Sequence, residues 1–269
     1  MRLPLALLVV IACAGAPALL GCEGEGPKTP LSYTADAKRS YEAALAEFDA
    51  HNWIEAQAML REVKRKYSYS KYARLAELRI ADADYAQEKY SDAIREYKDF
   101  VHAHRADADD IAYARSRIAE ATYAEIPDSV LMPSAEERDQ GTVIDCYKEL
   151  ESFLADYPDA KETARVRELL AEVTAHLVRH ELYVAKFYLN KDNYDAAVGR
   201  VTYALQKYGT GAGTGLEPEA LLVLGQTYLK MHKWDDARRA FESIVRGYAK
   251  TPSAVKAADY LDYLRQRGA

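Results

Sequence analysis

The sequence predicts an all-α solenoid of about five helix hairpins with a C-terminal capping helix. Apolar residues recur at helical spacing, a small residue recurs at one place in each second helix, and no run of alternating β-branched residues marks a strand after the first twenty residues. The clearest hairpin spans residues 217–249, where two apolar stripes flank the polar turn Met231-His232-Lys233. Such a hairpin cannot cover its own apolar faces, so neighbouring hairpins are expected to stack against it.

The small residues indicate where paired helices approach each other closely. In the last hairpin Gly225 and Ala237 lack bulk, and Leu224, Tyr228 and Phe241 are expected to fill the space around their contact. This spacing resembles that of the tetratricopeptide repeat. The small position of the second helix recurs at Ala56, Ala93, Cys146, Ala197 and Ala237.

In chain order, the first helices of the hairpins are expected at residues 35–50, 72–87, 111–125, 163–191 and 218–230. Second helices are expected to begin at Trp53, Tyr90, Tyr194 and Trp234, and that of the third hairpin starts atypically. Each second helix closes on an aromatic ring, at Tyr67, His104, Tyr157, Tyr208 and Tyr248. A last helix, at residues 252–267, has one face of alanine and leucine and would cover the exposed end of the stack.

The N-terminus predicts a lipoprotein signal peptide at residues 1–21. Arg2 precedes an apolar run that two prolines and a glycine interrupt, which is typical of a secretory signal and not of a membrane span. Leu19, Leu20 and Gly21 before Cys22 resemble the lipobox of bacterial lipoproteins, in which the cysteine is acylated. An ordinary signal peptide with an incidental cysteine is the alternative. The lipid on Cys22 would be the only attached group, since we expect no other cofactor.

Lipoproteins that are retained at the inner membrane often carry Asp directly after the acylated cysteine. This chain has Glu23 there instead, so the mature chain is expected at the periplasmic face of an outer membrane. Residues 22–33 contain two prolines and no apolar periodicity, so we expect a flexible tether. We assign repeats one to three to residues 34–160, and repeats four and five with the capping helix to residues 161–269.

Composition excludes some function classes. Lys and Arg total 36 against 42 Asp and Glu, without a basic patch, so no nucleic acid partner is expected. Cys146 would be the one unmodified cysteine of the mature chain, which leaves no internal disulfide. A reactive thiol is conceivable there, but its place at a small repeat position favours a buried structural role.

Few segments suggest chemistry. The glycine-rich residues 209–215 precede a helix but follow another helix and lack the Lys-Ser/Thr of a phosphate loop, which favours a hinge. His176 and His180 share a helix face but lack a third ligand, so surface histidines are expected and no metal site. Asp109 and Asp110 are typical of a helix N-terminus. We therefore expect no enzyme, and an enzyme would need an added catalytic module.

A lipobox followed by five such repeats resembles the BamD family of outer-membrane β-barrel assembly lipoproteins. The resemblance covers about residues 34–208 and is most specific at residues 181–201, which carry Tyr183, Tyr188 and Arg200 in the family's order. Arg138 and Asp139 match the Arg-Asp of its long loop, here residues 126–141. The chain departs from the family at Arg117, where a glycine is usual, and at Ser68 and Gly209, where proline is usual.

The resemblance implies a scaffold without a catalytic step. The C-terminal repeats would hold a periplasmic POTRA domain of a BamA-like barrel protein, and the N-terminal repeats would meet unfolded outer-membrane proteins or other Bam lipoproteins. Arg200 is the first candidate for an ion pair with BamA, and Lys191 is expected to assist; a solvated surface charge is the alternative for Arg200. Tyr183, Tyr188, Arg138 and Asp139 are further partner-binding candidates. A periplasmic adaptor of cell-envelope or division machinery remains open as another function.

Overall fold

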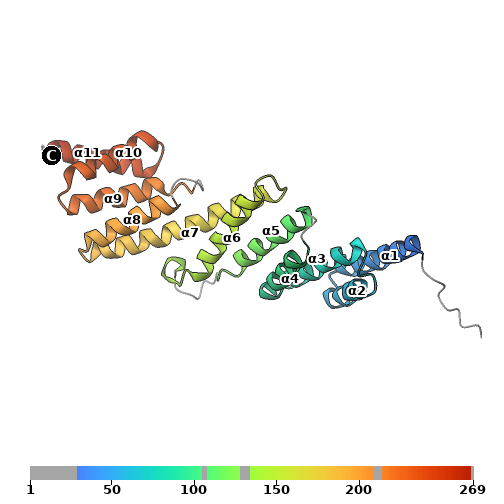
Figure 1. Cartoon of the computed structure of the whole chain (residues 1–269). Helices are drawn as coiled ribbons and strands as arrows, with labels where there is room; N and C mark the ends of the chain where they lie inside the picture. The colour runs from blue at the N-terminus through green and yellow to red at the C-terminus, as the bar shows by residue number, and fades with distance from the viewer. Residues whose placement is uncertain (1–28, 105–107, 128–133, 209–213, 268–269) are drawn as a thin grey trace, which may run out of the picture.

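The computed structural model describes residues 29–104, 108–127, 134–208 and 214–267. In these ranges eleven α-helices and one short 3-10 helix follow one another without a β-strand (Figure 1). They are α1 (Pro30–Asp49), α2 (Trp53–Lys66), α3 (Lys71–Ala86), α4 (Tyr90–Ala103), α5 (Ala108–Ala124), η1 (Ala135–Glu137), α6 (Gly141–Asp156), α7 (Thr163–Asn190), α8 (Tyr194–Tyr208), α9 (Glu217–Lys230), α10 (Trp234–Gly247) and α11 (Pro252–Gln266).

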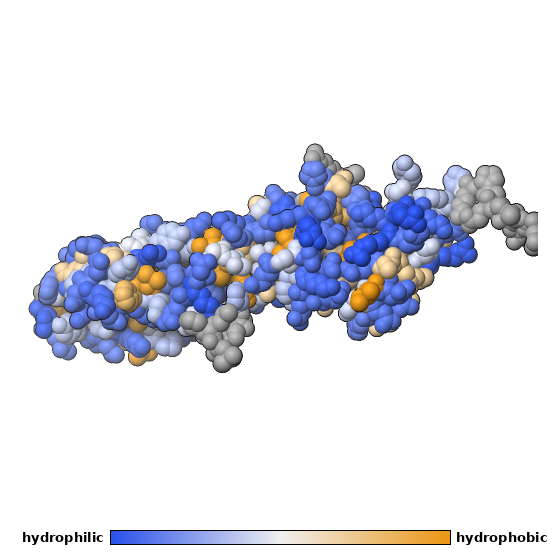
Figure 2. Space-filling model, turned by 90° about the horizontal axis from the view of Figure 1, so that it is seen from below, coloured by the Kyte–Doolittle hydropathy of each residue, from blue (hydrophilic) through white to orange (hydrophobic). Residues whose placement is uncertain are grey.

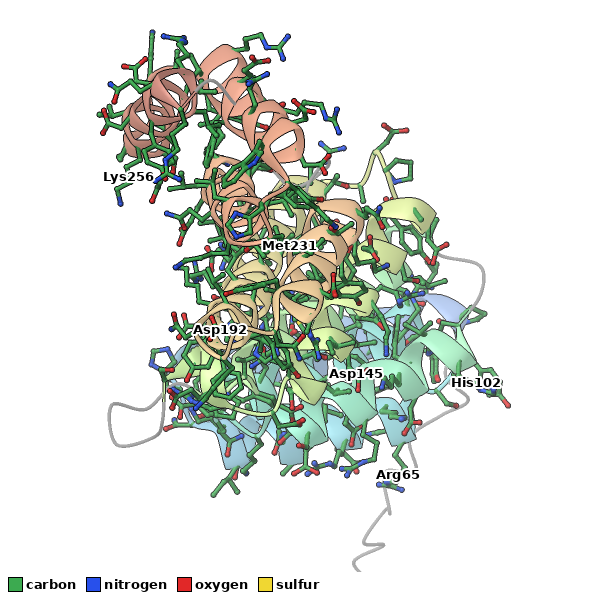
Figure 3. All side chains as sticks on the ribbon, turned by 90° about the vertical axis from the view of Figure 1, so that its left-hand side faces the viewer. Arg65, His102, Asp145, Asp192, Met231 and Lys256 are labelled. Carbon is green, nitrogen blue, oxygen red and sulfur yellow. The ribbon has the colours of Figure 1, made fainter. Side chains whose placement is uncertain are left out.

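The helices form hairpins that follow one another along one long axis, with α1 at one end and α11 at the other (Figure 1). The all-α repeat solenoid with a C-terminal capping helix is therefore confirmed. Helix α7 has 28 residues and packs on α6, α8 and η1, so it connects the middle of the stack to its C-terminal part. The surface is mostly hydrophilic with small separate apolar patches (Figure 2). Seen along the axis, charged side chains project all round, with Lys256 and Arg65 at opposite edges (Figure 3).

The small positions predicted from the sequence all lie at helix contacts. The side chains of Ala56, Ala93, Cys146, Ala197 and Ala237 are 0% exposed. Burial raises the pKa of the Cys146 thiol to about 12, so the thiol stays protonated at neutral pH and serves as a small apolar group, as predicted. The contact is closest at Gly225, where an added Cβ would lie 2.5 Å from Cε1 of Phe241.

Four hairpin turns share one backbone conformation that the sequence analysis did not predict. His51, Glu88, Asp192 and His232 have positive φ values of 62°, 60°, 56° and 59°. In each turn the next residue donates its N–H to a carbonyl five residues earlier, as Lys233 does to Tyr228 at 2.9 Å. Such a left-handed residue ends a helix and satisfies its terminal carbonyls. Glycine is the residue that usually marks such a left-handed position in a sequence. All four turns have a residue with a side chain there, so they are hard to recognise from the sequence.

The predicted aromatic residues do end the second helices. Tyr67, Tyr157 and Tyr248 are the residues that follow α2, α6 and α10, and each donates its backbone N–H to the carbonyl four residues earlier. His104 takes the same place after α4, and Tyr208 is the last residue of α8. Tyr67 and Tyr208 are 3% and 7% exposed, and the other three rings are partly buried, so an aromatic ring packs at the end of each hairpin.

The first helix starts earlier than the predicted tether allows. Helix α1 begins at Pro30, so residues 30–33 of the predicted tether 22–33 are helical. The Thr29 side chain accepts the N–H of Ser32, and Pro30 occupies the first helical turn. Proline has no N–H to satisfy there and its φ suits a helix, so it starts this helix instead of breaking it. Residues 1–28, which include the signal peptide, the lipobox and Cys22, lie outside the described residues.

The third hairpin is the irregular one, as expected from its long loop. Helix α5 is followed by residues 125–140, which include η1, before α6 begins at Gly141. The largest buried cluster extends from Ala119 of α5 to Val223 of α9 and crosses the turn between α6 and α7. The predicted division at residues 160 and 161 falls in that turn and stays a prediction. Residues 209–213 of the predicted glycine hinge lie outside the described residues.

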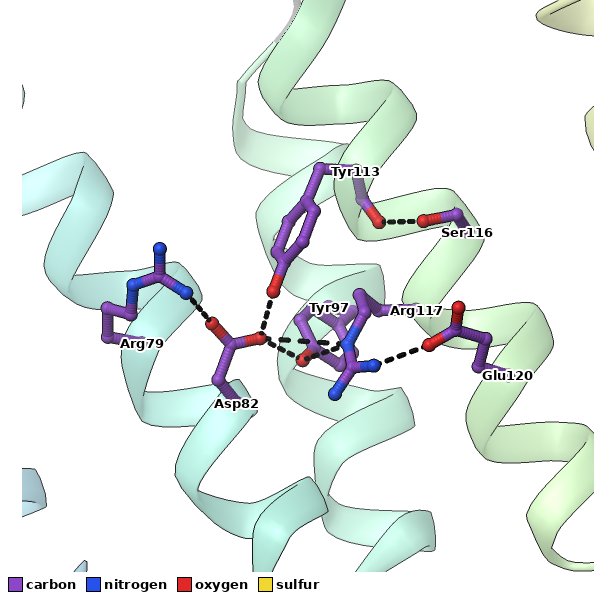
Figure 4. Close-up of polar contacts among 7 residues, drawn as sticks. All are labelled: Arg79, Asp82, Tyr97, Tyr113, Ser116, Arg117 and Glu120. Atoms are coloured by element: carbon purple, nitrogen blue, oxygen red, sulfur yellow. Dashed lines mark hydrogen bonds and ion pairs between the residues drawn. The ribbon is translucent and has the colours of Figure 1, made fainter. Parts of the chain in front are cut away.

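A buried carboxylate joins the second and third hairpins (Figure 4). Asp82 of α3 is 5% exposed and accepts hydrogen bonds from the hydroxyls of Tyr97 and of Tyr113, the second at 2.8 Å. Nη1 of Arg79 donates to the other carboxylate oxygen of Asp82, and Nε of Arg117 lies 3.8 Å from Oδ1 of Asp82. Burial raises the pKa of both phenols, and the Asp82 charge raises it further, so both remain donors. One carboxylate therefore satisfies groups from three helices.

The close contact at Gly225 predicts opposite effects for the same substitution at two helical glycines. Gly225→Ala should lower the free energy of unfolding by about 1–3 kcal/mol, because its Cβ has to displace the fully buried ring of Phe241. Gly199→Ala should raise stability by up to about 1 kcal/mol, because its Cβ meets nothing within 4 Å and alanine favours helix. Urea unfolding followed by circular dichroism measures both, and a neutral Gly225→Ala would contradict the predicted contact.

The buried carboxylate predicts a second pair of effects. Asp82→Asn should lower the free energy of unfolding by about 3 kcal/mol, because two arginines lose a buried counter-charge. Asp145→Asn is the control, because Asp145 is 71% exposed and pairs with Lys148 at the surface, which predicts a change below about 1 kcal/mol. Equal changes in thermal unfolding for the two variants would show that the Asp82 network does not stabilise the hairpin junction.

Candidate partner-binding site

Arg200, the first candidate from the sequence, lies in an open groove between α7 and α8. Its side chain is 44% exposed. The groove has a volume of about 490 Å³ and is lined by residues of both helices. Its lining residues are Glu181, Tyr188, Ala196, Gly199, Arg200 and Tyr203. The structure thus brings together Arg200 and Tyr188, two of the predicted candidates.

A buried glutamate holds the arginine in this groove. Nη1 of Arg200 donates to Oε2 of Glu181 at 3.2 Å, and the Glu181 side chain is only 10% exposed. A guanidinium has five N–H donors, and this bond uses one, so Arg200 keeps donors for a second carboxylate. Because its charge partner comes from another helix, the orientation of Arg200 depends on the packing of α7 against α8.

Small and aromatic residues shape the groove around the arginine. Gly199 and Ala196 lie one and four residues before Arg200 on α8, and their lack of bulk leaves the floor open. Tyr203 is 47% exposed, and its ring centroid lies 5.8 Å from that of the buried Tyr208. A shallow surface with one arginine between tyrosines is typical of protein interfaces, where Tyr and Arg contribute much of the binding energy.

Lys191 lies beyond this groove. It is the residue that ends α7, and its Nζ is 5.9 Å from the centroid of the Phe187 ring. Phe187 is 52% exposed and packs edge to face on Tyr188 at 5.7 Å. The two residues extend the aromatic surface next to the groove, but Lys191 is not among the residues that line it.

The other predicted candidates hold the loop of the third hairpin. The Tyr183 hydroxyl donates to Oε1 of Glu137 at 2.7 Å, and this bond raises the pKa of Tyr183. Arg138 donates to the carbonyl of Pro127, and Oδ2 of Asp139 accepts the N–H of Gly141 at 3.2 Å. In this structure these side chains contact their own chain and lie apart from the Arg200 groove.

His176 and His180, which were expected at the surface, are only partly exposed. Both are partly buried against the loop, and Nδ1 of His180 is 2.7 Å from the carbonyl oxygen of Glu136. Desolvation lowers the pKa of His176, whose Nε2 is buried and has no hydrogen-bond partner among the described residues. The helical spacing placed them on one face, but which segment covers that face depends on the tertiary fold. Among the described residues no group of three potential ligands is arranged for a metal ion.

Glu181 and Tyr203 are polar groove residues to which the sequence analysis gave no role. Glu181 carried a signal, because it lies between Leu177 and Ala185, four residues from each, and both are buried. An acidic residue within a buried apolar stripe needs a counter-charge. Its partner Arg200 is 19 residues away on another helix, so the pairing itself is visible only in the structure.

None of the helices in the described ranges is long and apolar enough to cross a membrane. A family model described as "YfiO: Outer membrane lipoprotein" matches residues 34–240. The chain is also similar to curated proteins named "Outer membrane protein assembly factor BamD". The protein of Caulobacter vibrioides is 26% identical over 90% of this chain and 75% of its own length. The protein of Neisseria gonorrhoeae is 21% identical over 87% of this chain and 89% of its own length.

Solved structures of tetratricopeptide proteins resemble it at low TM-scores. The TPR2AB-domain:pHSP90 complex of yeast Sti1 gives a TM-score of 0.43 at 15% identity over 86% of this chain and 90% of that chain. A thermophilic TPR protein of Thermus thermophilus gives 0.37 at 15% identity over 84% and 98%. The family match covers well over half of the residues and includes Arg200 and its groove. The chain therefore belongs to the YfiO family of outer membrane lipoproteins.

Proposed function

We propose that this protein is a non-catalytic scaffold of the outer-membrane β-barrel assembly machinery. Its relatives are named for outer membrane protein assembly, and they align over most of both chains, which is the observation that carries the proposal. In this proposal a lipid on Cys22 anchors the chain to the periplasmic face of the outer membrane. The protein then acts by binding other proteins, without a cofactor, a metal or nucleic acid.

The C-terminal repeats would hold a POTRA domain of a BamA-like barrel protein through the Arg200 groove. A partner carboxylate can bind the free N–H donors of Arg200 while Glu181 keeps the guanidinium in place. Charge-assisted bonds of this kind are strong when partly desolvated, and the exposed Tyr203 ring supplies apolar contact next to the charge. Lys191 and Phe187 would extend the same surface.

The N-terminal repeats would contact unfolded outer-membrane proteins or other Bam lipoproteins. Three large apolar side chains of the first hairpin and its turn are exposed, Leu31 at 85%, Ile54 at 82% and Tyr69 at 96%. Unfolded chains present apolar segments that such side chains can contact, and a solenoid offers a long surface for an extended peptide. Tyr183, Arg138 and Asp139 would contribute indirectly, since they shape the loop beside α7.

Charge reversal in the groove tests the POTRA contact. Arg200→Glu should reduce co-purification of the BamA-like protein from solubilised membranes at least tenfold, because it places two carboxylates together and repels the partner's. Arg246→Glu is the control, because Arg246 is 75% exposed and pairs with Glu242 of its own helix. Circular dichroism of both variants checks that the repeats stay folded.

Unchanged co-purification with Arg200→Glu would remove Arg200 from the interface. If the unaltered protein recovers no BamA-like partner and instead recovers division or cell-wall proteins, the adaptor function replaces the one proposed.

The lipid anchor is tested separately at Cys22, which lies outside the described residues. Cys22→Ser should move the protein from the membrane fraction to the soluble fraction, because each buried CH₂ of an acyl chain contributes about 0.8 kcal/mol to membrane binding. Fractionation with immunoblotting measures this, and a Ser variant that stays in membranes of cells lacking the BamA-like protein would contradict a lipid anchor.

A further inference from the structure

A second groove lies at the C-terminal end of the stack and shares no lining residue with the Arg200 groove. It has a volume of about 610 Å³. Four aromatic rings line it, those of Tyr194, Trp234, Tyr260 and Tyr263, together with the basic side chains of Lys230 and Arg267. None of its lining residues is acidic, although the whole protein has a formal net charge of -6. An aromatic and basic recess in an acidic protein suits a ligand that carries negative charge.

The walls of this groove are built by the packing of the capping helix. The ring of Tyr260 stacks on the buried Phe241 at 4.9 Å with an interplanar angle of 10°, and its hydroxyl accepts from Nε2 of Gln226 at 3.0 Å. Trp234 packs on the ring of His232 at 5.0 Å, at the left-handed turn between α9 and α10. The rings of Tyr260 and Trp234 are thus held in place before any ligand binds, which lowers the entropy cost of binding.

The basic residues are available to a ligand. Lys230 is the last residue of α9 and Arg267 directly follows α11, and neither forms an ion pair with another described residue. The guanidinium of Arg267 lies 4.9 Å from the centroid of the Tyr263 ring, which orients it over the groove wall. Cations at helix ends also stabilise the terminal carbonyls, but that role does not require an aromatic recess.

Part of this groove lies outside the matched family range, which ends at residue 240. Helix α11 supplies Tyr260, Tyr263 and Arg267 from beyond that limit. Tyr194, Lys230 and Trp234 lie within the matched range, and the inference from this groove does not depend on the function proposed above.

We propose that this groove binds an extended segment of a partner protein in which acidic side chains alternate with apolar or aromatic ones. Lys230 and Arg267 pair with the carboxylates, and the four rings contact the apolar side chains. A membrane surface is the weaker candidate, because Tyr194, Trp234 and Tyr260 are partly buried in the walls of a recess, whereas membrane anchors project their rings.

Tryptophan fluorescence tests this groove directly. The chain has two tryptophans, Trp53 and Trp234, so Trp53→Phe leaves Trp234 in the groove as the single reporter. The full chain with Cys22→Ser and Trp53→Phe is titrated with the blocked peptide Phe-Glu-Leu-Glu-Phe. We expect a saturable change in Trp234 emission. The peptides Phe-Gln-Leu-Gln-Phe and Ala-Glu-Ala-Glu-Ala should each bind at least tenfold more weakly, because one lacks charge and the other lacks apolar contact.

Variants of the basic residues complete the test. Lys230→Gln with Arg267→Gln should weaken binding of the acidic peptide at least tenfold and remove its salt dependence. Arg265→Gln is the matched control on the same helix, because Arg265 is exposed and pairs with Asp262, and it should leave the affinity unchanged.

Three results of the peptide titrations would each overturn the proposal. They are the absence of a saturable response, equal affinity for the acidic and the Gln peptides, and equal loss with Arg265→Gln. A Trp234 response to vesicles with anionic phosphatidylglycerol but not to the peptide would also overturn it and would assign the groove to a membrane surface.

Discussion

The structure depends on the close approach of two helices at one small residue in every hairpin. At Gly225 the Phe241 ring occupies the space of a Cβ, and at Ala56, Ala93 and Ala197 the contact leaves no exposed surface. Because dense packing fixes how each helix pair meets, it also fixes which apolar faces remain for the next pair. The stack, its capping helix and the grooves between its helices follow from this repeated contact.

Charged residues refine what the apolar contacts build. Asp82 joins α3, α4 and α5, and Arg117 completes that network with its guanidinium 3.8 Å from the centroid of the Tyr85 ring. Glu181 joins α7 and α8 through its ion pair with Arg200, whose side chain is 44% exposed. The first network closes a junction, whereas the second presents a cation at the surface. Only the second network lines a groove, which makes it the candidate binding site.

The long helix α7 connects the parts of the molecule that the proposals use. In its second half, His180 and Tyr183 pack on the loop of the third hairpin, and Glu181 and Tyr188 line the Arg200 groove. Leu189, near its end, contributes to the aromatic groove at the capping helix. A rigid helix keeps these surfaces at fixed separations, which suits a scaffold that binds more than one protein.

The sequence by itself determined the helix hairpins, their small contact residues and the aromatic residues that end them, because the helical period and local steric rules act within a few residues of chain. It also singled out Arg200 through the family resemblance. Only the tertiary structure decided that Glu181 holds Arg200, that His176 is covered by a loop, and that rings from α8, α10 and α11 form one groove. These contacts join residues on different helices, so they depend on stacking angles that local pattern does not encode.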